Sequence, residues 1–421
     1  MKKLLMCSAA VALGLAVAAP AKADGIKLDL AGHFKGYVTW LSQDTSPNVN
    51  ERHFDILRET EIHFTGETTL DNGLTVGVHH EADIDSEHMI ADNAVSSNTP
   101  GDLFVTEESY AYFSGAWGRV NFGKEDGANY LLQVAAPSAD ENYDGLRQYI
   151  NPQNLGLTGN AALIKGAGGG TVGGGTRGFT NTGKLDYSND ATGYDNKITY
   201  LTPVWSGFQA GASYTPSSGG SLSVGGVSST NEASKAFGVP QTNQDGIYGD
   251  AWEGAVRYEG KFQEVGLTAG GGYTKVKLQS DSAAVDTQSD FNQWNLGAAL
   301  TWQQFGLGGV YTRDNGGVDS NGQNRTWVGG VDYTTGPFKL GASYLNNHES
   351  LGTNAAGTVS NGSLNTTRWA GGVVYTYGPG MTFRGSVGWV RSSIPTDGGN
   401  AASGGGSDKA TDLLLGTQIN F

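Results

Sequence analysis

The fold is decided by the last ten residues of the chain, Asp412 to Phe421, which read DLLLGTQINF. Successive side chains of a strand point to opposite faces, so alternate positions of this stretch form two separate surfaces. One surface carries Leu413, Leu415, Ile419 and Phe421, and the other carries Asp412, Gly416, Gln418 and Asn420. Only Leu414 is out of place. A strand that is apolar on one side and polar on the other suits a wall between lipid and water.

The same two-residue period recurs near the other end of the chain, over residues 26–40. Apart from two glycines, one face is apolar: Ile26, Leu28, Leu30, Phe34, Val38 and Trp40. The opposite face carries Lys27, Asp29, His33, Lys35, Tyr37 and Thr39. A later stretch, LDNG at 70–73, predicts a tight hairpin because Asn-Gly accepts the positive φ that hairpin turns require.

Short and long connections alternate along the rest of the chain. Short ones are predicted near 70–73, 114–118, 203–207, 260–264, 303–305, 335–338 and 378–381. Long ones are predicted near 43–53, 86–103, 125–194, 215–249, 279–290, 314–324, 347–365 and 392–409. Seven short turns and eight long loops separate sixteen strands. We therefore expect an all-β protein, a transmembrane antiparallel β-barrel of sixteen strands.

The first 23 residues have the pattern of an export signal. Lys2 and Lys3 precede an uncharged apolar run over 4–19, and Ala21-Lys22-Ala23 is a small-x-small cleavage site. The run is shorter than the roughly 20 residues that a membrane-spanning helix needs. Cleavage after Ala23 would leave one barrel domain, residues 24–421.

Composition narrows the class of protein further. The single cysteine, Cys7, lies inside the signal, so neither disulfides nor thiolate metal sites are expected. Three lysines would leave with the signal, so 23 basic residues face 41 acidic ones and the net charge is near −18. Such a charge argues against nucleic acid as a partner. The mean hydropathy of −0.33 is compatible with a barrel, which spreads its apolar residues over every second position.

Motifs for chemistry are weak in this sequence. A G-x-G-x-x-G match at 168–173 lies in a glycine-rich loop, without the strand and helix that a dinucleotide site requires. His79 and His80 are neighbours on a strand, point to opposite faces and cannot share a metal. The chain has no H-E-x-x-H, G-x-S-x-G or P-loop motif. We expect no catalytic residue, cofactor or metal site.

Three segments in order resemble the general porins of bacterial outer membranes. Residues 107–124 (EESYAYFSGAWGRVNFGK) resemble their strand-turn-strand unit, 62–67 (IHFTGE) resemble their second strand, and 196–214 resemble the hairpin after their pore loop. The resemblance implies an outer-membrane homotrimer with a water-filled pore in each subunit. It also implies that the third extracellular loop, residues 125–194, folds inward, and that Phe421 is recognised by the outer-membrane insertion machinery.

Candidate pore-lining residues come from this loop and from strand positions of inward parity. The loop supplies Glu125, Asp126, Asp140, Glu141, Asp144 and Arg147; the strands supply His33, Lys35, Glu59, Glu61, Glu107, Arg257, Arg368 and Arg384. Where the family carries basic residues on its first strands, this sequence has His33, Glu61 and Glu107. Because carboxylates outnumber basic groups at the predicted constriction, we expect a modest cation preference.

The expected function is passive diffusion of small hydrophilic solutes and ions. One alternative is a substrate-specific channel for a sugar or an anion. Another is an outer-membrane enzyme, for which His53, His88 and His348 in predicted outer loops would be candidates. A third is a structural barrel with a plugged lumen. Membrane lipid and lipopolysaccharide are expected partners, with divalent cations bridging the acidic loop 81–92 to phosphates.

Overall fold

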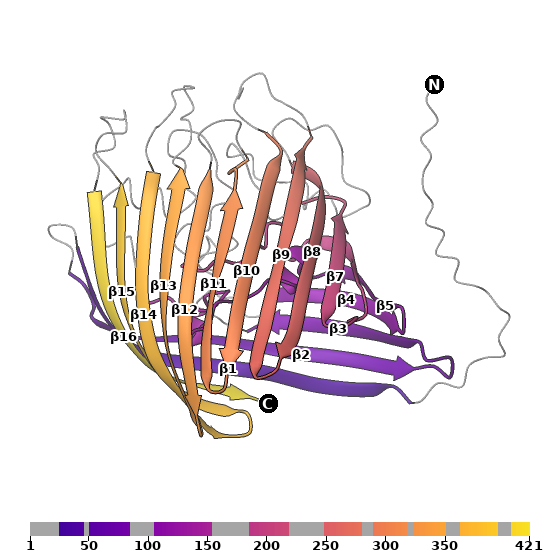
Figure 1. The fold of residues 1–421 in the computed structure, drawn as a ribbon, viewed down its shortest axis with the longest axis horizontal. Coiled ribbons are helices and arrows are strands. Elements are labelled where there is room, and N and C mark those ends of the chain that lie inside the picture. Colours follow the sequence, from indigo (N-terminus) through magenta and orange to yellow (C-terminus); the bar gives the residue numbers. More distant parts are fainter. Residues whose placement is uncertain are drawn as a thin grey trace.

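The computed structural model describes residues 25–45, 50–84, 105–153, 185–218, 248–279, 289–317, 323–350, 363–394 and 406–421. Sixteen antiparallel strands follow one another in chain order, and β1 pairs with β16 to close the barrel (Figure 1). The predicted sixteen-stranded barrel is confirmed. The predicted export signal (1–23), the G-x-G-x-x-G match and His88 lie outside the described residues.

The strands run almost the whole length of the described chain. The first eight are β1 (Lys27–Gln43), β2 (Phe54–Thr69), β3 (Thr75–Asp83), β4 (Val105–Gly115), β5 (Gly118–Lys124), β6 (Asn196–Leu201), β7 (Phe208–Thr215) and β8 (Tyr248–Phe262). The others are β9 (Val265–Leu278), β10 (Phe291–Trp302), β11 (Phe305–Asp314), β12 (Asn324–Thr335), β13 (Phe338–Ser350), β14 (Ser363–Gly378), β15 (Met381–Ile394) and β16 (Gly406–Asn420).

The short turns fall where the sequence predicts them, between β2 and β3 and then between each following even-odd pair up to β14 and β15. Gly73 closes the first of these turns with a φ of 81°, and Gly380 closes the last with a φ of 73°. Both values lie in the left-handed region that glycine adopts without steric strain, so the Asn-Gly prediction of a tight turn holds.

Alternate residues of each strand form an apolar outer face and a polar inner face. On β16, Leu413 and Leu415 are exposed on the outer face, whereas Asp412 on the inner face is fully buried. Leu414, which breaks the pattern, is also fully buried and packs against Tyr143 and Ile150. Those two residues belong to the long connection between β5 and β6, which explains an apolar side chain on the inner face of the barrel. None of the helices among the described residues is long and apolar enough to cross a bilayer.

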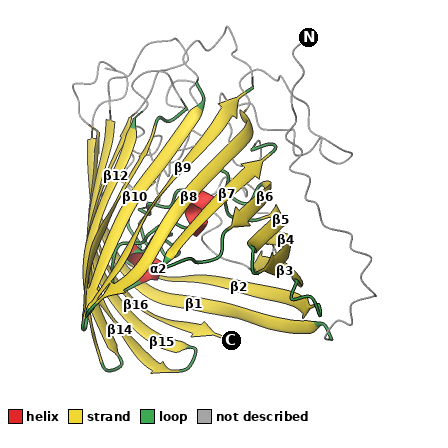
Figure 2. Cartoon of the chain, turned by 45° about the vertical axis from the view of Figure 1, so that its right-hand side comes forward, coloured by secondary structure: helices red, strands yellow, loops and turns green. Residues whose placement is uncertain are grey.

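The connection between β5 and β6, residues 125–195, is called the insert below, and its described parts are 125–153 and 185–195. It contains two single-turn helices, α1 (Ala128–Leu131) and α2 (Glu141–Asp144), which lie inside the barrel (Figure 2). Helix α1 contacts β6 to β9. A hydrophobic cluster then joins the insert to β11–β15: Ala136, Leu185, Tyr187, Val310, Val328, Leu345 and Val390. The main buried core of the protein thus lies between the insert and the barrel wall.

Glycines on the inner face of the wall make room for the insert. A Cβ built at Gly272 of β9 would overlap Asn129, one at Gly330 of β12 would overlap the Pro137 carbonyl, and one at Gly388 of β15 would overlap the Tyr143 hydroxyl. Glycine permits this close approach because it has no side chain. The inner wall is therefore shaped to hold the insert against it.

Candidate functional site inside the barrel

Asp140 anchors the insert to strands from both ends of the chain. Its carboxylate accepts hydrogen bonds from Tyr37 Oη at 2.9 Å and from Ser386 Oγ at 3.0 Å. Arg384 of β15 donates to it at 2.9 Å, and the two side chains of this ion pair are 6% and 1% exposed. Two residues predicted to line the pore, Asp140 and Arg384, are thus brought together in a buried contact that fastens the insert.

A second anchor is built around Arg368 of β14, which is fully buried. Its guanidinium donates to the backbone carbonyls of Leu185 at 2.7 Å, Tyr143 at 3.2 Å and Asp144 at 3.4 Å. The Asp144 carboxylate accepts from Ser343 Oγ at 2.6 Å. Burial raises the pKa of Asp144, while the nearby Arg368 opposes that rise. Arg368 therefore lies beneath the insert, and the Asp144 carboxylate faces the barrel wall rather than the free surface of the insert.

The beginning and end of the insert are tied together by Arg147. Its guanidinium lies 2.7 Å from the Asp190 carboxylate and 3.3 Å from that of Asp126, and it donates to Tyr194 Oη. Burial, assisted by the charge of Asp190, raises the pKa of Asp126 well above its ordinary value, and Arg147 opposes this. The cluster thus holds one guanidinium between two carboxyls, and burial keeps the pKa of the Asp126 carboxyl above its ordinary value.

Three further predicted residues lie at the edges of the insert. Glu125 is buried and accepts from Asn121 Nδ2 at 2.6 Å, and burial raises the pKa of its carboxyl. Arg257 of β8 donates to the Gln133 carbonyl at 3.0 Å. Glu141 is 68% exposed, with a carboxylate oxygen 3.7 Å from Arg384. Of these three, only Glu141 presents a largely exposed charge.

The inner faces of β1 to β4 carry a run of charged and imidazole side chains, called here the His–Glu wall. Its members are His33, Lys35, Glu59, Glu61, His63, His79, Glu81, Glu107 and Glu108. Lys35 Nζ lies 2.7 Å from Glu59 and 3.2 Å from the centre of the Tyr149 ring of the insert. Tyr149 is therefore one point at which the insert meets the wall.

A β-bulge turns two consecutive glutamates inward on β4. Glu81 pairs with Glu108 and Ala82 pairs with Thr106, so Glu107 is the extra residue. Glu107 accepts from Tyr194 Oη at 3.1 Å, and Glu108 accepts from the Asp126 backbone N–H at 3.3 Å. Strict alternation allows only one of two consecutive residues to point inward, and the sequence analysis chose Glu107, so it missed Glu108.

Sequence reasoning also passed over His63, His79 and Glu81. His63 follows Glu61 by two residues and shares its face, and His79 and Glu81 share a face of β3. Pairing of β2 with β3 sets His63 directly opposite Glu81. The sequence shows which residues of a strand share a face. It does not show how β2 and β3 pair, and this pairing is what brings His63 and Glu81 together.

Two of the three histidines considered for an enzyme, His53 and His348, lie in the described part of the chain, and each has partners of its own. His53 stacks on Trp40 with ring centres 5.8 Å apart, and its Nδ1 lies 3.1 Å from Glu51. His348 Nδ1 lies 2.7 Å from Asn365 Oδ1. Neither contact sets a hydroxyl or thiol nucleophile beside the imidazole, as nucleophilic catalysis requires.

Comparisons with known proteins agree with this architecture. The anion-selective porin from Comamonas acidovorans superposes with a TM-score of 0.56 and 17% sequence identity, covering 94% of this chain and 100% of that chain. OmpF of Salmonella typhi, solved with daunomycin, gives a TM-score of 0.54 at 15% identity, covering 94% of this chain and 98% of that one. At these identities the likeness concerns the fold alone.

Sequence comparison leads to the same group. An uncharacterised protein of Rickettsia prowazekii is 27% identical over 199 residues, and the match spans 38% of this chain and 45% of that relative. The sequence profile of the Gram-negative porins matches residues 8–395. With a closed sixteen-stranded barrel and a match over nearly the whole sequence, this chain belongs to the Gram-negative porin family and is a multi-pass β-barrel of the outer membrane.

Proposed function

We propose that this protein is a passive diffusion channel for small hydrophilic solutes and ions, with a modest preference for cations. The observation that carries the proposal is the position of the insert. It covers the inner face of the strands from β6 round to β16, and it faces the His–Glu wall at Tyr149 and Tyr194. The remaining passage is then bounded on one side by the insert and on the other by the wall.

The cation preference follows from which charges face that passage. Arg368 is fully buried, and Arg384 is neutralised by Asp140, so these two arginines contribute little to the field there. Glu61 lies beside His33 and His63, and Glu81 lies beside His63 and His79. These carboxylates thus have imidazole partners in place of lysine or arginine, and an imidazole carries a positive charge only when it is protonated.

Only charges near the path of an ion count. Salt at physiological strength screens interactions beyond about 8 Å, whereas unit charges about 4 Å apart interact by roughly 4 kcal/mol at an effective dielectric near 20. The acidity of outer loops therefore has little influence on selectivity. Because Arg368 is buried and Arg384 is paired with Asp140, these arginines do not provide the row of free positive charges that a dedicated anion channel would need.

The test is the reversal potential across a KCl gradient in a planar bilayer. Wild-type protein should prefer K⁺, and the double variant Glu61→Gln/Glu107→Gln should prefer it less. Glu264→Gln removes one carboxylate from an exposed turn between β8 and β9 and serves as the control for each of the two substitutions. A wild-type channel that prefers chloride, or a control that shifts as much as the wall variant, would contradict the proposal.

Assembly and export complete the proposal. OmpT of Vibrio cholerae, a structural relative at 14% identity and a TM-score of 0.52, was solved in a trimer form, and we propose a homotrimer for this chain. Light scattering of the detergent-solubilised protein should give three chains per particle, and a monomer would refute the trimer.

We further propose cleavage after Ala23, recognition of Phe421 by the insertion machinery, and contact with lipopolysaccharide. Mass spectrometry of the mature N-terminus checks the cleavage.

A further inference from the structure

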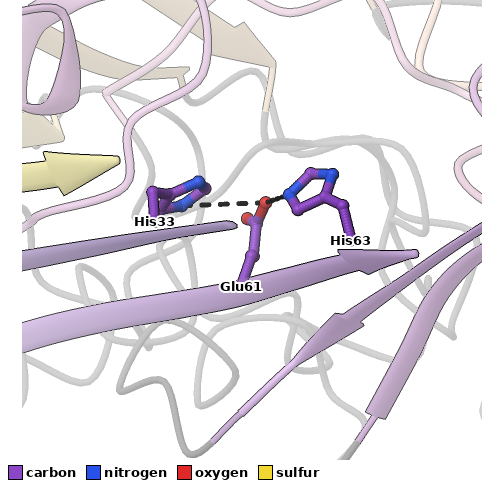
Figure 3. Close-up of side chains that lie close together, drawn as sticks. All are labelled: His33, Glu61 and His63. Carbon is purple, nitrogen blue, oxygen red and sulfur yellow. Dashed lines mark ion pairs between the residues drawn. The ribbon is translucent and has the colours of Figure 1, made fainter. Parts of the chain in front are cut away.

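Two histidines and a glutamate converge on the inner faces of β1 and β2 (Figure 3). Glu61 Oε2 lies 3.7 Å from His33 Nε2 and 3.3 Å from His63 Nε2. The side chains of His33, Glu61 and His63 are 15%, 9% and 25% exposed, so they are partly buried but reachable by water. We propose that these three residues bind zinc or another divalent first-row transition metal.

The spacing of the donor atoms suits a tetrahedral ion. Zinc binds imidazole nitrogen and carboxylate oxygen at about 2.0–2.1 Å, which sets tetrahedral ligand atoms about 3.4 Å apart. The two distances from Glu61 lie on either side of that value, and the three donor atoms all lie within 4.8 Å of one another. An ion can therefore enter once the two imidazole nitrogens, which lie within 4.8 Å of each other, move toward that spacing.

Rigid strand pairing holds the donors in place. Pairing of β1 with β2 sets His33 directly opposite Glu61, and His63 follows two residues along on the same face. Side chains directly opposite on one face of an antiparallel pair have Cβ atoms about 4.5–5.5 Å apart. A site built on strands of a closed sheet is pre-organised, because the backbone cannot relax without breaking the ladder.

The surroundings of His63 supply the outer support that such sites need. Its Nδ1 lies 3.2 Å from Glu81 Oε2. Donation of the Nδ1 proton to Glu81 leaves the Nε2 lone pair directed at the metal position, which is the carboxylate–histidine–metal arrangement. Two imidazoles and one carboxylate also form a donor set that zinc accepts and that Ca²⁺ and Mg²⁺, which prefer oxygen alone, do not favour.

Glu59 completes the surroundings on the other side. Both of its carboxylate oxygens lie 2.9 Å from His33 Nε2, and Lys35 holds the carboxylate at 2.7 Å. A proton on His33 Nε2 joins the ring to these oxygens when metal is absent. A bound ion would take the place of that proton, and the Glu59 carboxylate would stay paired with Lys35 beside the ring.

A neighbouring set, His63, His79 and Glu81, shares His63 with the proposed site. His79 Nε2 lies 3.6 Å from Glu81 Oε2, so its spacing is also compatible with a metal. The two sets use opposite nitrogens of His63: Nε2 faces Glu61 and Nδ1 faces Glu81. Either set would leave a carboxylate on the other nitrogen of His63. We assign the ion to the first set because its carboxylate is the more buried, Glu61 being 9% exposed and Glu81 13%. Replacing His33 and replacing His79 distinguish the two.

Occupancy has a consequence for the pore that rests on the proposed channel function. A divalent ion adds two positive charges to the His–Glu wall, close to Glu61. The preference for cations should then fall, and with it the K⁺ current. Binding of the metal does not depend on this consequence and is measured separately.

Binding is measured by calorimetric titration of ZnCl₂ into the full chain in detergent, with EDTA-treated protein at the start. Wild-type protein should take up one ion per chain, and His33→Ala/His63→Ala should lose this binding. Glu81→Gln should weaken it about 10- to 100-fold, as loss of an orienting carboxylate does. His79→Ala should leave the affinity within about threefold, since it removes no ligand. His348→Ala, which lies on β13, is the matched control.

The folding of each variant is checked by its β-type far-UV spectrum and by the shift in gel migration on boiling. Absence of zinc uptake by wild-type protein overturns the proposal, as does uptake by His33→Ala/His63→Ala at wild-type affinity. Loss of binding in His79→Ala with retention in His33→Ala assigns the metal to the neighbouring set and also overturns it. If zinc binds and bilayer current does not change, the metal site stands and its effect on the pore is refuted.

Discussion

Replacing Asp140 with asparagine should release the insert from the wall. The carboxylate of Asp140 receives Arg384, Tyr37 and Ser386, and the arginine of this pair is only 6% exposed. Asparagine keeps the shape of the side chain but removes its charge, so the guanidinium is left buried without its partner. Glu141 lies 3.7 Å away but is 68% exposed, and solvent screens most of its effect.

The expected size of the effect follows from the burial of this pair. Removing one partner of a buried ion pair costs about 3–5 kcal/mol, because an uncompensated charge remains. At about 1.4 kcal/mol per factor of ten, the ratio of docked to released insert falls by about 150- to 4,000-fold. Removing both charges, with Asp140→Asn and Arg384→Met together, should restore much of the docking, because no buried charge is then unpaired.

The assay is single-channel conductance in a planar bilayer, with liposome swelling by sugars of increasing size. Asp140→Asn should raise the conductance or make it noisy and admit larger sugars, and the double variant should lie closer to wild type. Asp71→Asn in the exposed turn between β2 and β3 is the control for charge alone. Unchanged conductance in a folded Asp140→Asn barrel, or a double variant more open than the single one, would refute the reasoning.

Other consequences of the same structure are directly measurable. Deleting residues 140–147 should raise conductance or admit larger sugars in liposome swelling; unchanged behaviour of a folded variant would show that this segment does not narrow the lumen. Gly388→Val should lower the temperature at which the folded band is lost on gels and increase conductance, because a side chain there overlaps Tyr143; Gly378→Val, where a Cβ meets nothing within 4 Å, should do neither. Acidification should change the single-channel conductance of wild-type protein and not that of Asp126→Asn, because burial raises the pKa of the Asp126 carboxyl, which then gains a proton and loses its ion pair with Arg147 at a higher pH than an exposed aspartate would. The far-UV spectrum should be of β type, and a helix-dominated spectrum would contradict the fold.

Several features of the candidate site depend on neighbours that lie far away in the sequence. Parity predicts an inward side chain for Arg368 and Arg384, but parity alone does not tell that the insert covers the first and neutralises the second. Leu414 breaks the polar pattern of β16 because the insert places Tyr143 and Ile150 against it. Glu107 faces inward beside Glu108 because a bulge interrupts the pairing of β3 with β4.

The sequence by itself determined the barrel, the positions of its short turns and the outer face of its strands. These features are local: side chains alternate with a period of two, and a turn such as Asn72-Gly73 depends on the backbone freedom of its own residues. Only the tertiary structure decided which charges meet, because register between strands and docking of the insert join residues that no short-range pattern connects. His33 faces Glu61, and Asp140 faces Arg384, because the sheet closes and the insert packs against glycines of its inner wall.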